Sequence, residues 1–583
     1  MYLANLSISR FRSCEDVTVN IRPYLTVLVG ENNGGKSNVI DAIRLLTMPL
    51  NGRRERYPED RDLRHGSTIQ NFQIEGKYRQ LGDTLKGLLI SAVPDPTQDE
   101  AIFGYRYETR SDLAPRGRST LWAGRFDTND PESGSTDLIR HVYLPPLRDA
   151  HVALGSGSGS RVMALFRHFL SKNEEPDFLA SVKRSATPPD VLNRMNTEIG
   201  AALALLTSGV RPQTTDLGFS SESLLDVARD LRFRLADAGL NPDEIQASGL
   251  GYSNLLYMAS VAVELAKARE TDLTLFLVEE PEANLHPQLQ TLVLEFLLDH
   301  ARQSASRNLE PGKPEGRIQI IATTHSPNLT AWVSPTHLVI LKSKRRVENG
   351  VTTSSTVCVP VAELGMKPKT LAKISRYLDV TRSALLFGDR VILVEGIAEA
   401  LLLPTIAQHI VLANDKDAWL RFKGAVIVPI EGVDFRPYVE ILLRPYRGVR
   451  IADRVIVVTD ADPTVLGNRR SDLEMLASSY QASDCLSVLT NQRTLEHEIF
   501  SAGNERFLKL VFRRLHPNSR NDWASRIEGL EAAERSQAFL DLIAAKRTRK
   551  GDLAQAIASR IEARERFVVP EYLSSAIRGA SAL

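Results

Sequence analysis

Residues 27–43 read V-L-V-G-E-N-N-G-G-K-S-N-V-I-D-A-I, and this stretch decides how the first half of the chain folds. Apolar β-forming residues lead into Gly30, a glycine-rich turn follows, and apolar residues then recur at helical spacing. The spacing G-x-x-x-x-G-K-S, which runs from Gly30 to Ser37, is typical of a phosphate loop between a strand and a helix. The sequence therefore predicts a nucleotide-binding α/β domain built around this loop.

Each part of the loop suits the binding of a triphosphate. Glycines let backbone N–H groups converge on phosphate oxygens, and the helix N-terminus adds a positive dipole. Lys36 is expected to reach the β- and γ-phosphates, and Ser37 to ligate Mg²⁺. An ordinary glycine turn is the alternative, but every motif position and both flanking elements fit a nucleotide. The loop residues predicted to bind ATP are Gly30, Asn32, Asn33, Gly35, Lys36 and Ser37.

Length and composition restrict the class of protein. The chain has 583 residues, is 43% hydrophobic and 25% charged, and carries a formal net charge of +1. These values predict several soluble domains and exclude a global basic field for nucleic acid. The three cysteines lie far apart, so we expect neither a zinc knuckle nor a disulfide framework. With no apolar run of membrane-spanning length and no signal peptide, a cytoplasmic protein without membrane contact is expected.

A glycine-serine segment interrupts the nucleotide domain. Residues 155–160 read G-S-G-S-G-S, which indicates a flexible joint, and residues 161–208 and 222–240 then show helical periodicity. We therefore predict a first part of the domain at 1–155 and a helical insertion at 156–245. Two interpretations fit this arm equally well, namely dimerisation and packing on its own domain.

Three further motifs complete the predicted nucleotide site. Residues 247–259 open a helix with a small, glycine-punctuated turn, which suits a phosphate at a helix N-terminus. A buried strand ends in Glu279 and Glu280, of which the first suits Mg²⁺ and the second suits polarisation of the attacking water. Another buried strand ends in His325, which suits a sensor of the γ-phosphate. Glu280 and His325 are thus the candidate catalytic residues for ATP hydrolysis.

The order of these motifs resembles that of ABC-type ATPases of the RecF and chromosome-maintenance kind. In that family the signature turn of one protomer closes over the ATP held by the other. The resemblance implies an ATP-dependent homodimer, one Mg²⁺ ion bound with ATP, and a second part of the ATPase at 246–378. It also implies that Ser248, Gly249 and Gly251 contact ATP in trans.

Acidic residues follow two buried strands in the second half of the chain. Glu395 follows one strand, and Glu399 lies one helical turn later. Asp460 and Asp462 follow the other strand. Because the carboxyl ends of parallel strands meet at one edge of a sheet, we expect these side chains to converge. Converging carboxylates need compensating charge, which Mg²⁺ or Mn²⁺ supplies, whereas unrelated capping acids at strand ends are the alternative.

A strand-Glu-Gly element followed by a strand with D-x-D resembles the Toprim domain. A Toprim domain behind this kind of ATPase resembles the OLD (overcoming lysogenization defect) family, which includes the nuclease subunit of Gabija-type phage defence. The expected fold class is α/β, with an ABC-type ATPase domain that carries an inserted helical arm. A Toprim domain with a Rossmann-like parallel sheet and C-terminal helices is then expected at 379–583. Weaker sequence similarity to the family is present at residues 143–149, 381–387 and 567–573.

The resemblance also implies a further acid and a lysine. Glu496, in T-L-E, best matches the acid as a metal ligand. Lys550 best matches the lysine, with Lys546 as the alternative, and a lysine there would stabilise charge that develops on the phosphate. Glu395 is expected to be both a metal ligand and a catalytic residue.

The implied chemistry is metal-assisted phosphodiester transfer, with one ion for the nucleophile and one for the leaving oxygen. The sequence thus predicts an ATP-hydrolysing, metal-dependent DNA endonuclease with two ions at the Toprim site, used in phage defence or DNA repair. A non-catalytic DNA-clamping ATPase and an RNA-cleaving defence toxin stay open as alternatives. Whether a helicase is a partner, and whether ATP activates or restrains cutting, does not follow from the sequence.

One charged region has two interpretations. Residues 505–566 are rich in Arg and Lys and contain Phe507 and Trp523. A local DNA-facing strip fits this composition. A solvated helical face fits it at least as well, because acids are nearly as frequent.

Overall fold

The chain divides between Pro360 and Val361 into two units, Met1–Pro360 and Val361–Leu583. Within the described part of the chain, every helix is too short or too polar to cross a membrane. The computed structural model describes all residues except 51, 53, 55, 65, 67–68, 110–116, 147–168, 170–189, 208, 210, 212, 220–230, 238–242, 245–249, 308–311, 349–350, 380–381, 462–467 and 583.

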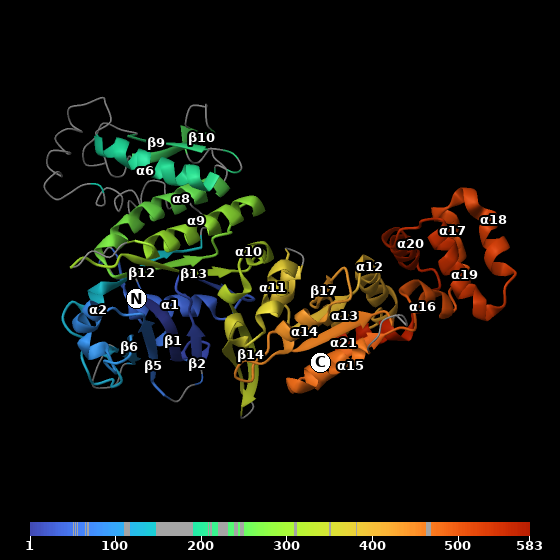
Figure 1. Cartoon of the computed structure of the whole chain (residues 1–583), viewed down its shortest axis with the longest axis horizontal. Helices are drawn as coiled ribbons and strands as arrows, with labels where there is room; N and C mark the ends of the chain where they lie inside the picture. Colours follow the sequence, from blue (N-terminus) through green and yellow to red (C-terminus); the bar gives the residue numbers. More distant parts are fainter. Residues whose placement is uncertain are drawn as a thin grey trace. The chain divides into compact units, whose positions relative to one another are not determined.

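A largely parallel sheet forms the centre of the first unit (Figure 1). The described strands follow the order β15-β14-β3-β13-β12-β8-β4, and only β15 runs antiparallel to its neighbour. Because parallel strands share one carboxyl edge, the ends of β3, β13 and β12 lie together there. The strands are β3 (Leu25–Val29), β4 (Met48–Pro49), β8 (Ile139–Leu144), β12 (Leu273–Glu279), β13 (Arg317–Thr324), β14 (Leu338–Glu348) and β15 (Val351–Pro360).

The helix that follows the phosphate loop lies between this sheet and a second one. α1 (Lys36–Leu46) buries Val39, Ile40 and Ile43 completely, and it contacts β13 on one side and β1, β5 and β6 on the other. The second sheet is antiparallel in the order β2-β1-β5-β6-β7. Its strands are β1 (Tyr2–Phe11), β2 (Cys14–Asn20), β5 (Asn71–Arg79), β6 (Glu100–Glu108) and β7 (Arg118–Ala123).

The insertion is not wholly helical, so this part of the sequence prediction is wrong. α6 (Asp190–Thr207) is a helix, but β9 (Gln213–Phe219), β10 (Leu231–Asp237) and β11 (Asp243–Glu244) form a small antiparallel sheet. In β10 the sequence L-R-F-R-L alternates apolar and charged residues, which is the period of a strand. The remaining residues of 222–240 lie outside the described part of the chain.

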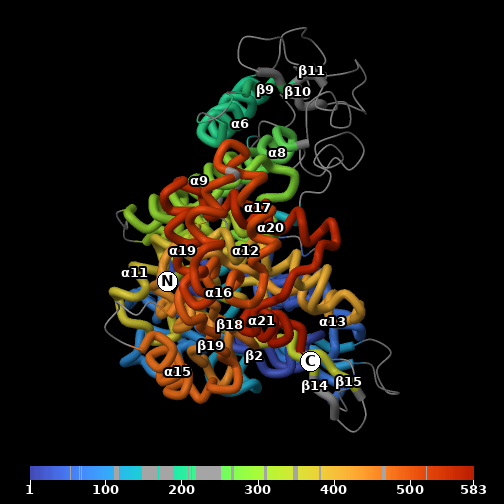
Figure 2. The backbone as a smooth tube through the Cα atoms, turned by 90° about the vertical axis from the view of Figure 1, so that its right-hand side faces the viewer, coloured from blue at the N-terminus to red at the C-terminus, as the bar shows by residue number. Residues whose placement is uncertain are grey.

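The helix of the insertion packs on two helices of the first unit. α6 packs against α8 (Leu250–Glu264) and α9 (Pro287–Ala305), and α9 packs on β13, as Figures 1 and 2 show. The short helix α10 (Pro327–Trp332) follows β13 and packs against α9. A further short helix, α2 (Asp83–Leu88), lies between the strands β5 and β6 in the sequence.

The second unit has a parallel sheet of four described strands in the order β17-β16-β18-β19. The sequence predicts one connecting helix over residues 371–387, and this prediction is wrong, because α11 (Pro368–Tyr377) ends at Tyr377 and the backbone N–H of Arg382 donates to Asp379 at the start of a separate turn. The other elements around the sheet are β16 (Arg390–Val394), α12 (Ile397–Ile406), α13 (Lys416–Lys423), β17 (Val426–Pro429), α14 (Arg436–Leu443), β18 (Arg454–Thr459), α15 (Arg469–Ser479) and β19 (Leu486–Thr490).

Helices complete the second unit after β19. Trp523 and Phe507, which were considered for a DNA-facing strip, are 0% and 6% exposed in the helical core. They are therefore unavailable to stack on bases, and the aromatic part of that interpretation is wrong. The helices are α16 (Leu495–Ser501), α17 (Glu505–Leu515), α18 (Arg520–Trp523), α19 (Ala532–Ala545), α20 (Lys550–Glu562) and α21 (Glu571–Ser581).

Candidate functional site

The phosphate loop joins β3 to α1, and its shape requires glycine at two positions. A Cβ atom at Gly30 would collide with the carbonyl oxygen of Leu341 in β14. Gly35, the N-cap residue of α1, has a φ of +98°, which strains any residue with a side chain. The glycines thus let the loop turn tightly at the carboxyl edge of the sheet, in front of the N-terminus of α1.

Lys36 folds back into this loop. Its Nζ atom donates to the carbonyl oxygens of Gly30 at 2.8 Å and Glu31 at 2.7 Å, and lies 3.4 Å from Nδ1 of His325. Burial lowers the pKa of Lys36 to about 8, against the opposing effect of nearby glutamates, the foremost being Glu280. A phosphate in the loop would give this buried ammonium an anionic partner in place of two carbonyls.

Glu279 connects β12 to the loop. Its carboxylate accepts hydrogen bonds from Ser37 Oγ at 2.9 Å and from Tyr143 Oη at 3.1 Å. Burial raises the pKa of Glu279. The structure therefore places the two residues predicted to bind Mg²⁺, Ser37 and Glu279, in direct contact. Tyr143 lies in one of the stretches of weaker similarity, but its bond to Glu279 was not predicted.

Glu280 and His325 also meet at this edge. Oε1 of Glu280 lies 3.4 Å from Nε2 of His325. The backbone of Glu280 has a φ of +47°, and its N–H group donates to the carbonyl oxygen of Thr323 at 3.1 Å. Burial lowers the pKa of His325 and Lys36 lowers it further, against the opposing effect of Glu280, which favours the neutral ring. Glu282, which the sequence analysis missed, accepts from the backbone N–H of His325 at 2.9 Å.

Of the three predicted signature residues, only Gly251 lies in the described part of the chain. Ser248 and Gly249 lie outside it. Gly251 stands in the first turn of α8, where a Cβ atom would approach the carbonyl oxygen of Asn284 to 2.9 Å. Glycine thus allows α8 to pack closely against the segment that follows Glu280.

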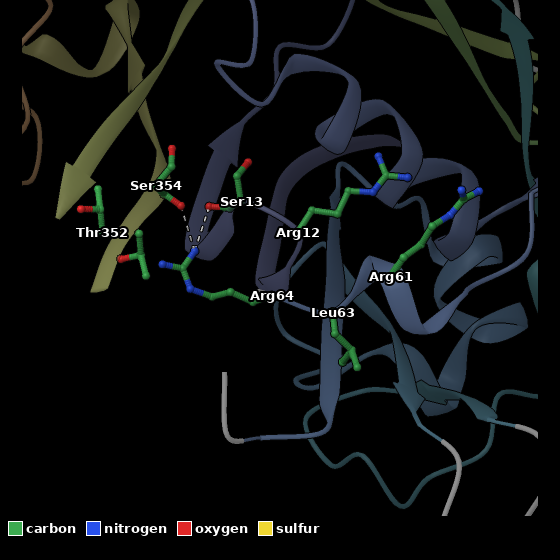
Figure 3. A pocket seen from close by; sticks show the side chains of 8 residues that line it. Arg12, Ser13, Arg61, Leu63, Arg64, Thr352 and Ser354 are labelled. Atoms are coloured by element: carbon green, nitrogen blue, oxygen red, sulfur yellow. Dashed lines mark hydrogen bonds between the residues drawn. The ribbon is translucent and has the colours of Figure 1, made fainter. Parts of the chain in front are cut away.

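An arginine-rich pocket of about 430 Å³ adjoins the phosphate loop. Asn38, which follows Ser37, accepts from Arg12 at 3.1 Å and donates to Ser13 Oγ at 2.7 Å, and this links the pocket to α1. Figure 3 shows Arg64 reaching toward Ser13 and Ser354. No sequence motif predicts this pocket, because its lining comes from distant segments of the chain. The lining residues are Arg12, Ser13, Arg61, Leu63, Arg64, Thr352, Thr353 and Ser354.

A second site lies at the carboxyl edge of the sheet in the second unit. Glu395 follows β16 and Asp460 follows β18, and the backbone N–H of Asp460 donates to Oε1 of Glu395 at 2.8 Å. Glu399, in the first turn of α12, is 7% exposed. Glu496, in the first turn of α16, is 5% exposed. Four of the predicted carboxylates are therefore placed near this edge.

Burial chiefly, and repulsion between acids in addition, raise the pKa values of two carboxyl groups in this site. Burial raises the pKa of Glu399 to about 7, and repulsion from Asp460 and Glu496 adds to the effect of burial. Burial likewise raises the pKa of Asp460 to about 6, against a hydrogen bond from Asn491. A divalent cation would balance such a group of carboxylates.

Lys550 supplies a positive charge beside these acids. Its Nζ atom, at the start of α20, lies 4.0 Å from Oε1 of Glu496. Lys546, the alternative, pairs with Asp522 instead. Asp462 lies outside the described residues, and within the described ones no three Asp, Glu, His or Cys side chains are gathered closely enough to hold a metal ion. The donor set thus fits Mg²⁺ or Mn²⁺ by its oxygen chemistry, while the described carboxylates alone do not close a coordination shell.

Comparison with known proteins finds a family model for part of each unit. The family model "AAA ATPase domain" matches residues 1–181 and 224–330. The model "Overcoming lysogenization defect protein-like, TOPRIM domain" matches residues 386–462, which hold Glu395, Glu399 and Asp460. The chain belongs to the OLD family. The family and the α/β fold class expected from the sequence are both confirmed.

Named relatives of this OLD-family chain are distant. It is 22% identical over 469 residues to "Endonuclease GajA" of Bacillus cereus (strain VD045), covering 75% of this chain and 72% of the relative. It is 23% identical over 429 residues to "Old nuclease" of Escherichia phage P2, covering 68% of each protein. Among solved structures, an SmcHead bound to the C-winged helix domain of ScpA is 17% identical, with a TM-score of 0.41, covering 62% of this chain and 98% of that one.

Arg469 is a residue of this OLD-family site that the sequence analysis missed. It opens α15, and its NH1 group donates to Oε1 of Glu395 at 3.0 Å, to the carbonyl oxygen of Asp460 at 3.1 Å and to Thr459 Oγ1. One guanidinium therefore ties the ends of β16 and β18 together. Arg469 belongs to no sequence motif, and the sequence does not distinguish it from the adjacent Arg470.

Replacing Arg469 with alanine is expected to destabilise the protein by about 1–3 kcal/mol, because it removes a charged hydrogen-bond donor from partly buried acceptors. Arg470→Ala is the matched control. Arg470 pairs with Glu474 on the exposed face of α15, where such pairs contribute about 0.3–0.5 kcal/mol. Urea unfolding measures the free energy of unfolding of both variants. An equal decrease in the two would contradict the role of Arg469 in connecting the ends of β16 and β18.

The metal-free protein is expected to lose stability as the pH rises from 5 to 8. The pKa of Glu399 is about 7 in the folded chain, compared with an ordinary value of 4.5 for a glutamate side chain. Between these values the folded state holds a proton that the unfolded state has released, so a rising pH favours unfolding, by up to about 3 kcal/mol once the pH exceeds 7. Glu399→Gln removes this titration. Melting temperatures across this pH range should therefore fall less steeply for the variant, whereas parallel curves would contradict the shift.

Proposed function

We propose that this OLD-family chain is an ATP-hydrolysing, divalent-metal-dependent DNA endonuclease that cuts phosphodiester bonds at the carboxylate edge of its Toprim domain. The observation that carries the proposal is that Glu399, Asp460 and Glu496 repel one another electrostatically, beside Lys550, at the end of a parallel sheet. Buried carboxylates that repel one another destabilise a purely structural module, so a catalytic role accounts for them best. The names of the relatives, an endonuclease and a nuclease, support the same activity.

In this proposal the acidic residues hold two Mg²⁺ or Mn²⁺ ions, with Glu395 and Asp462 as further ligands. Bound ions would supply activation of the attacking water and neutralisation of charge on the phosphate. Lys550 would hold its ammonium toward the developing phosphorane charge. Arg469 would keep Glu395 and the end of β18 in register.

The first unit would bind ATP at the phosphate loop. Lys36 would contact the β- and γ-phosphates, and Ser37 and Glu279 would hold one Mg²⁺ ion. Glu280 and His325 would orient and polarise the attacking water, and the arginine-rich pocket beside Asn38 would receive the α-phosphate and ribose. Following the family pattern, a second copy of the chain would complete the site with Ser248, Gly249 and Gly251.

ATP binding would then set the geometry of a homodimer and so regulate access to the nuclease site. We place this activity in the cytoplasm, in phage defence or DNA repair, with a helicase as a candidate partner. The experiment that tests the function incubates the purified chain with supercoiled plasmid DNA and, separately, with RNA of the same sequence. Each substrate is assayed with and without Mn²⁺, Mg²⁺ and ATP.

Each outcome of this assay discriminates between the candidate functions. Nicked or linear plasmid that appears only with a divalent ion supports the endonuclease. Cleavage of RNA but not of DNA would favour the toxin. DNA that the protein binds in an ATP-dependent manner but leaves intact would favour the DNA-clamping ATPase. Cleavage of RNA alone and binding of intact DNA would each overturn the proposal.

A further inference from the structure

The last helix, α21, packs on the sheet of the second unit and runs from the carboxyl ends of the strands to their amino ends. Three arginines donate to the last carbonyl groups of α21, namely Arg454 to Gly579 at 2.8 Å, Arg390 to Ala580 at 3.1 Å and Arg421 to Ser581 at 2.7 Å. Arg390 and Arg454 are the first residues of β16 and β18. The C-terminus of α21 is therefore fixed at the amino edge of the sheet.

The length of α21 carries its other end to the carboxylate edge. The helix has 11 residues and β16 has 5, and at about 1.5 Å and 3.3 Å per residue both span roughly 16 Å. α21 packs along β16, β18 and β19. Its first turn, which contains Tyr572, thus lies at the end of the sheet where Glu395 and Asp460 stand. This turn belongs to the stretch 567–573, which the proposed function leaves without a role.

Tyr572 brings a buried hydroxyl group to that edge. Its Oη atom is buried and makes no hydrogen bond of good geometry with a described residue. Burial raises the pKa of Tyr572 well above its usual value, with the adjacent amide of Asn491 opposing this effect and Asp460 and Glu399 adding to it. The hydroxyl group therefore keeps its proton and is available as a donor.

Asn491 connects this hydroxyl group to the acidic site. It follows β19, and its Nδ2 atom donates to Oδ1 of Asp460. Its Oδ1 atom accepts from the backbone N–H of Ala461 at 3.1 Å. A carbonyl oxygen of an amide has two lone pairs, so Oδ1 of Asn491 can accept a second hydrogen bond.

We propose that Tyr572 is a positioning residue for the carboxylate site, which donates to Asn491 when a divalent ion is bound and thereby fixes the orientation of Asp460 toward that ion. This inference rests on the proposed metal-dependent function. In the structure the buried donor has no partner of good geometry, which is unfavourable. Binding of an ion to Asp460 would complete the hydrogen bond and so gain from it.

Binding of Mn²⁺ to the full-length protein, measured by calorimetry, tests this role without recourse to activity. Tyr572→Phe removes only the hydroxyl group, and we expect the dissociation constant for Mn²⁺ to rise by less than the roughly 10-fold that is typical when a direct partner of a metal ligand is lost. Asn491→Leu should weaken binding at least as much. The matched control is Tyr438→Phe, which removes a buried hydroxyl group elsewhere in the same unit and should leave the constant unchanged.

Thermal melting separates this role from a merely structural one. Without metal, Tyr572→Phe should melt at the temperature of the wild type or above it, because an unsatisfied donor is lost. With saturating Mn²⁺, its gain in melting temperature should be smaller than that of the wild type. A variant that melts lower with and without metal, and binds Mn²⁺ normally, would overturn the inference.

Asp460→Asn distinguishes this failure from failure of the proposed function. If Asp460→Asn loses Mn²⁺ binding while Tyr572→Phe binds like the wild type, the metal site stands and the role of Tyr572 is wrong. If Asp460→Asn also binds like the wild type, the metal site itself is wrong and the inference fails with it.

Discussion

Asp460→Ala is expected to reduce metal-dependent nicking of supercoiled plasmid about 1,000-fold or more, which corresponds to about 4 kcal/mol of transition-state stabilisation. Asp460 lies at the centre of the acidic group, since its backbone N–H holds Glu395 and its carboxylate interacts with Glu399. Its removal takes a candidate metal ligand from the middle of the site. The rate of plasmid relaxation in Mn²⁺, followed on agarose gels, gives the measurement.

Two further variants show whether the loss comes from the carboxylate. Asp460→Asn keeps the shape of the side chain and can still accept from Asn491, yet it should be as inactive as the alanine variant. Asp472→Ala removes an exposed acid from the first turn of α15 and should cut DNA like the wild type. Full cleavage by either Asp460 variant would exclude this edge of the sheet as the site of chemistry.

Lys36→Ala is expected to lower ATP hydrolysis about 100-fold or more while some nicking persists. Nζ of Lys36 is the cation in the phosphate loop, and its place between the carbonyls of Gly30 and Glu31 puts it where a γ-phosphate would bind. The Toprim site belongs to the other unit, so its acids keep their arrangement. Phosphate release with Mg²⁺ and ATP gives the hydrolysis rate.

Matched variants make this second prediction specific. Lys86→Ala removes a lysine that pairs with Asp99 far from the loop in sequence, and it should hydrolyse ATP normally. Asp460→Ala should also hydrolyse ATP, whereas Lys36→Ala should not. If both activities fell together in both variants, a single shared site would explain the data better than two.

The main features of both sites could be predicted because they depend on local patterns. The spacing from Gly30 to Ser37 fixes a loop, and the rule that parallel strands end at one edge brings Glu279 to Ser37 and Glu395 to Asp460. These contacts span long stretches of sequence, but the sheet order that creates them follows from short strand motifs.

Other features depend on side-chain contacts that no spacing reveals. Arg469, Asn491 and Tyr572 meet the acids only through the packing of α15, β19 and α21. Lys546 and Lys550 are only about one helical turn apart in sequence, so the sequence does not show which of them lies beside the acids. The structure shows that Lys550, the first residue of α20, lies beside Glu496, whereas Lys546 pairs with Asp522. The strands of the insertion were missed because short alternating runs such as L-R-F-R-L were interpreted with a helical period.

The position of β3 has a consequence for how the first unit can acquire its structure. β3 pairs with β13 and β14, whose residues come roughly 300 positions later in the chain. Loop closure over such distances is slow, and until it occurs the apolar strand before the phosphate loop has two open edges. During synthesis, the central sheet of the first unit therefore cannot form around β3 until β14, which begins at Leu338, has been made. Fragments that stop earlier should aggregate, and a soluble ATPase fragment should extend to Pro360.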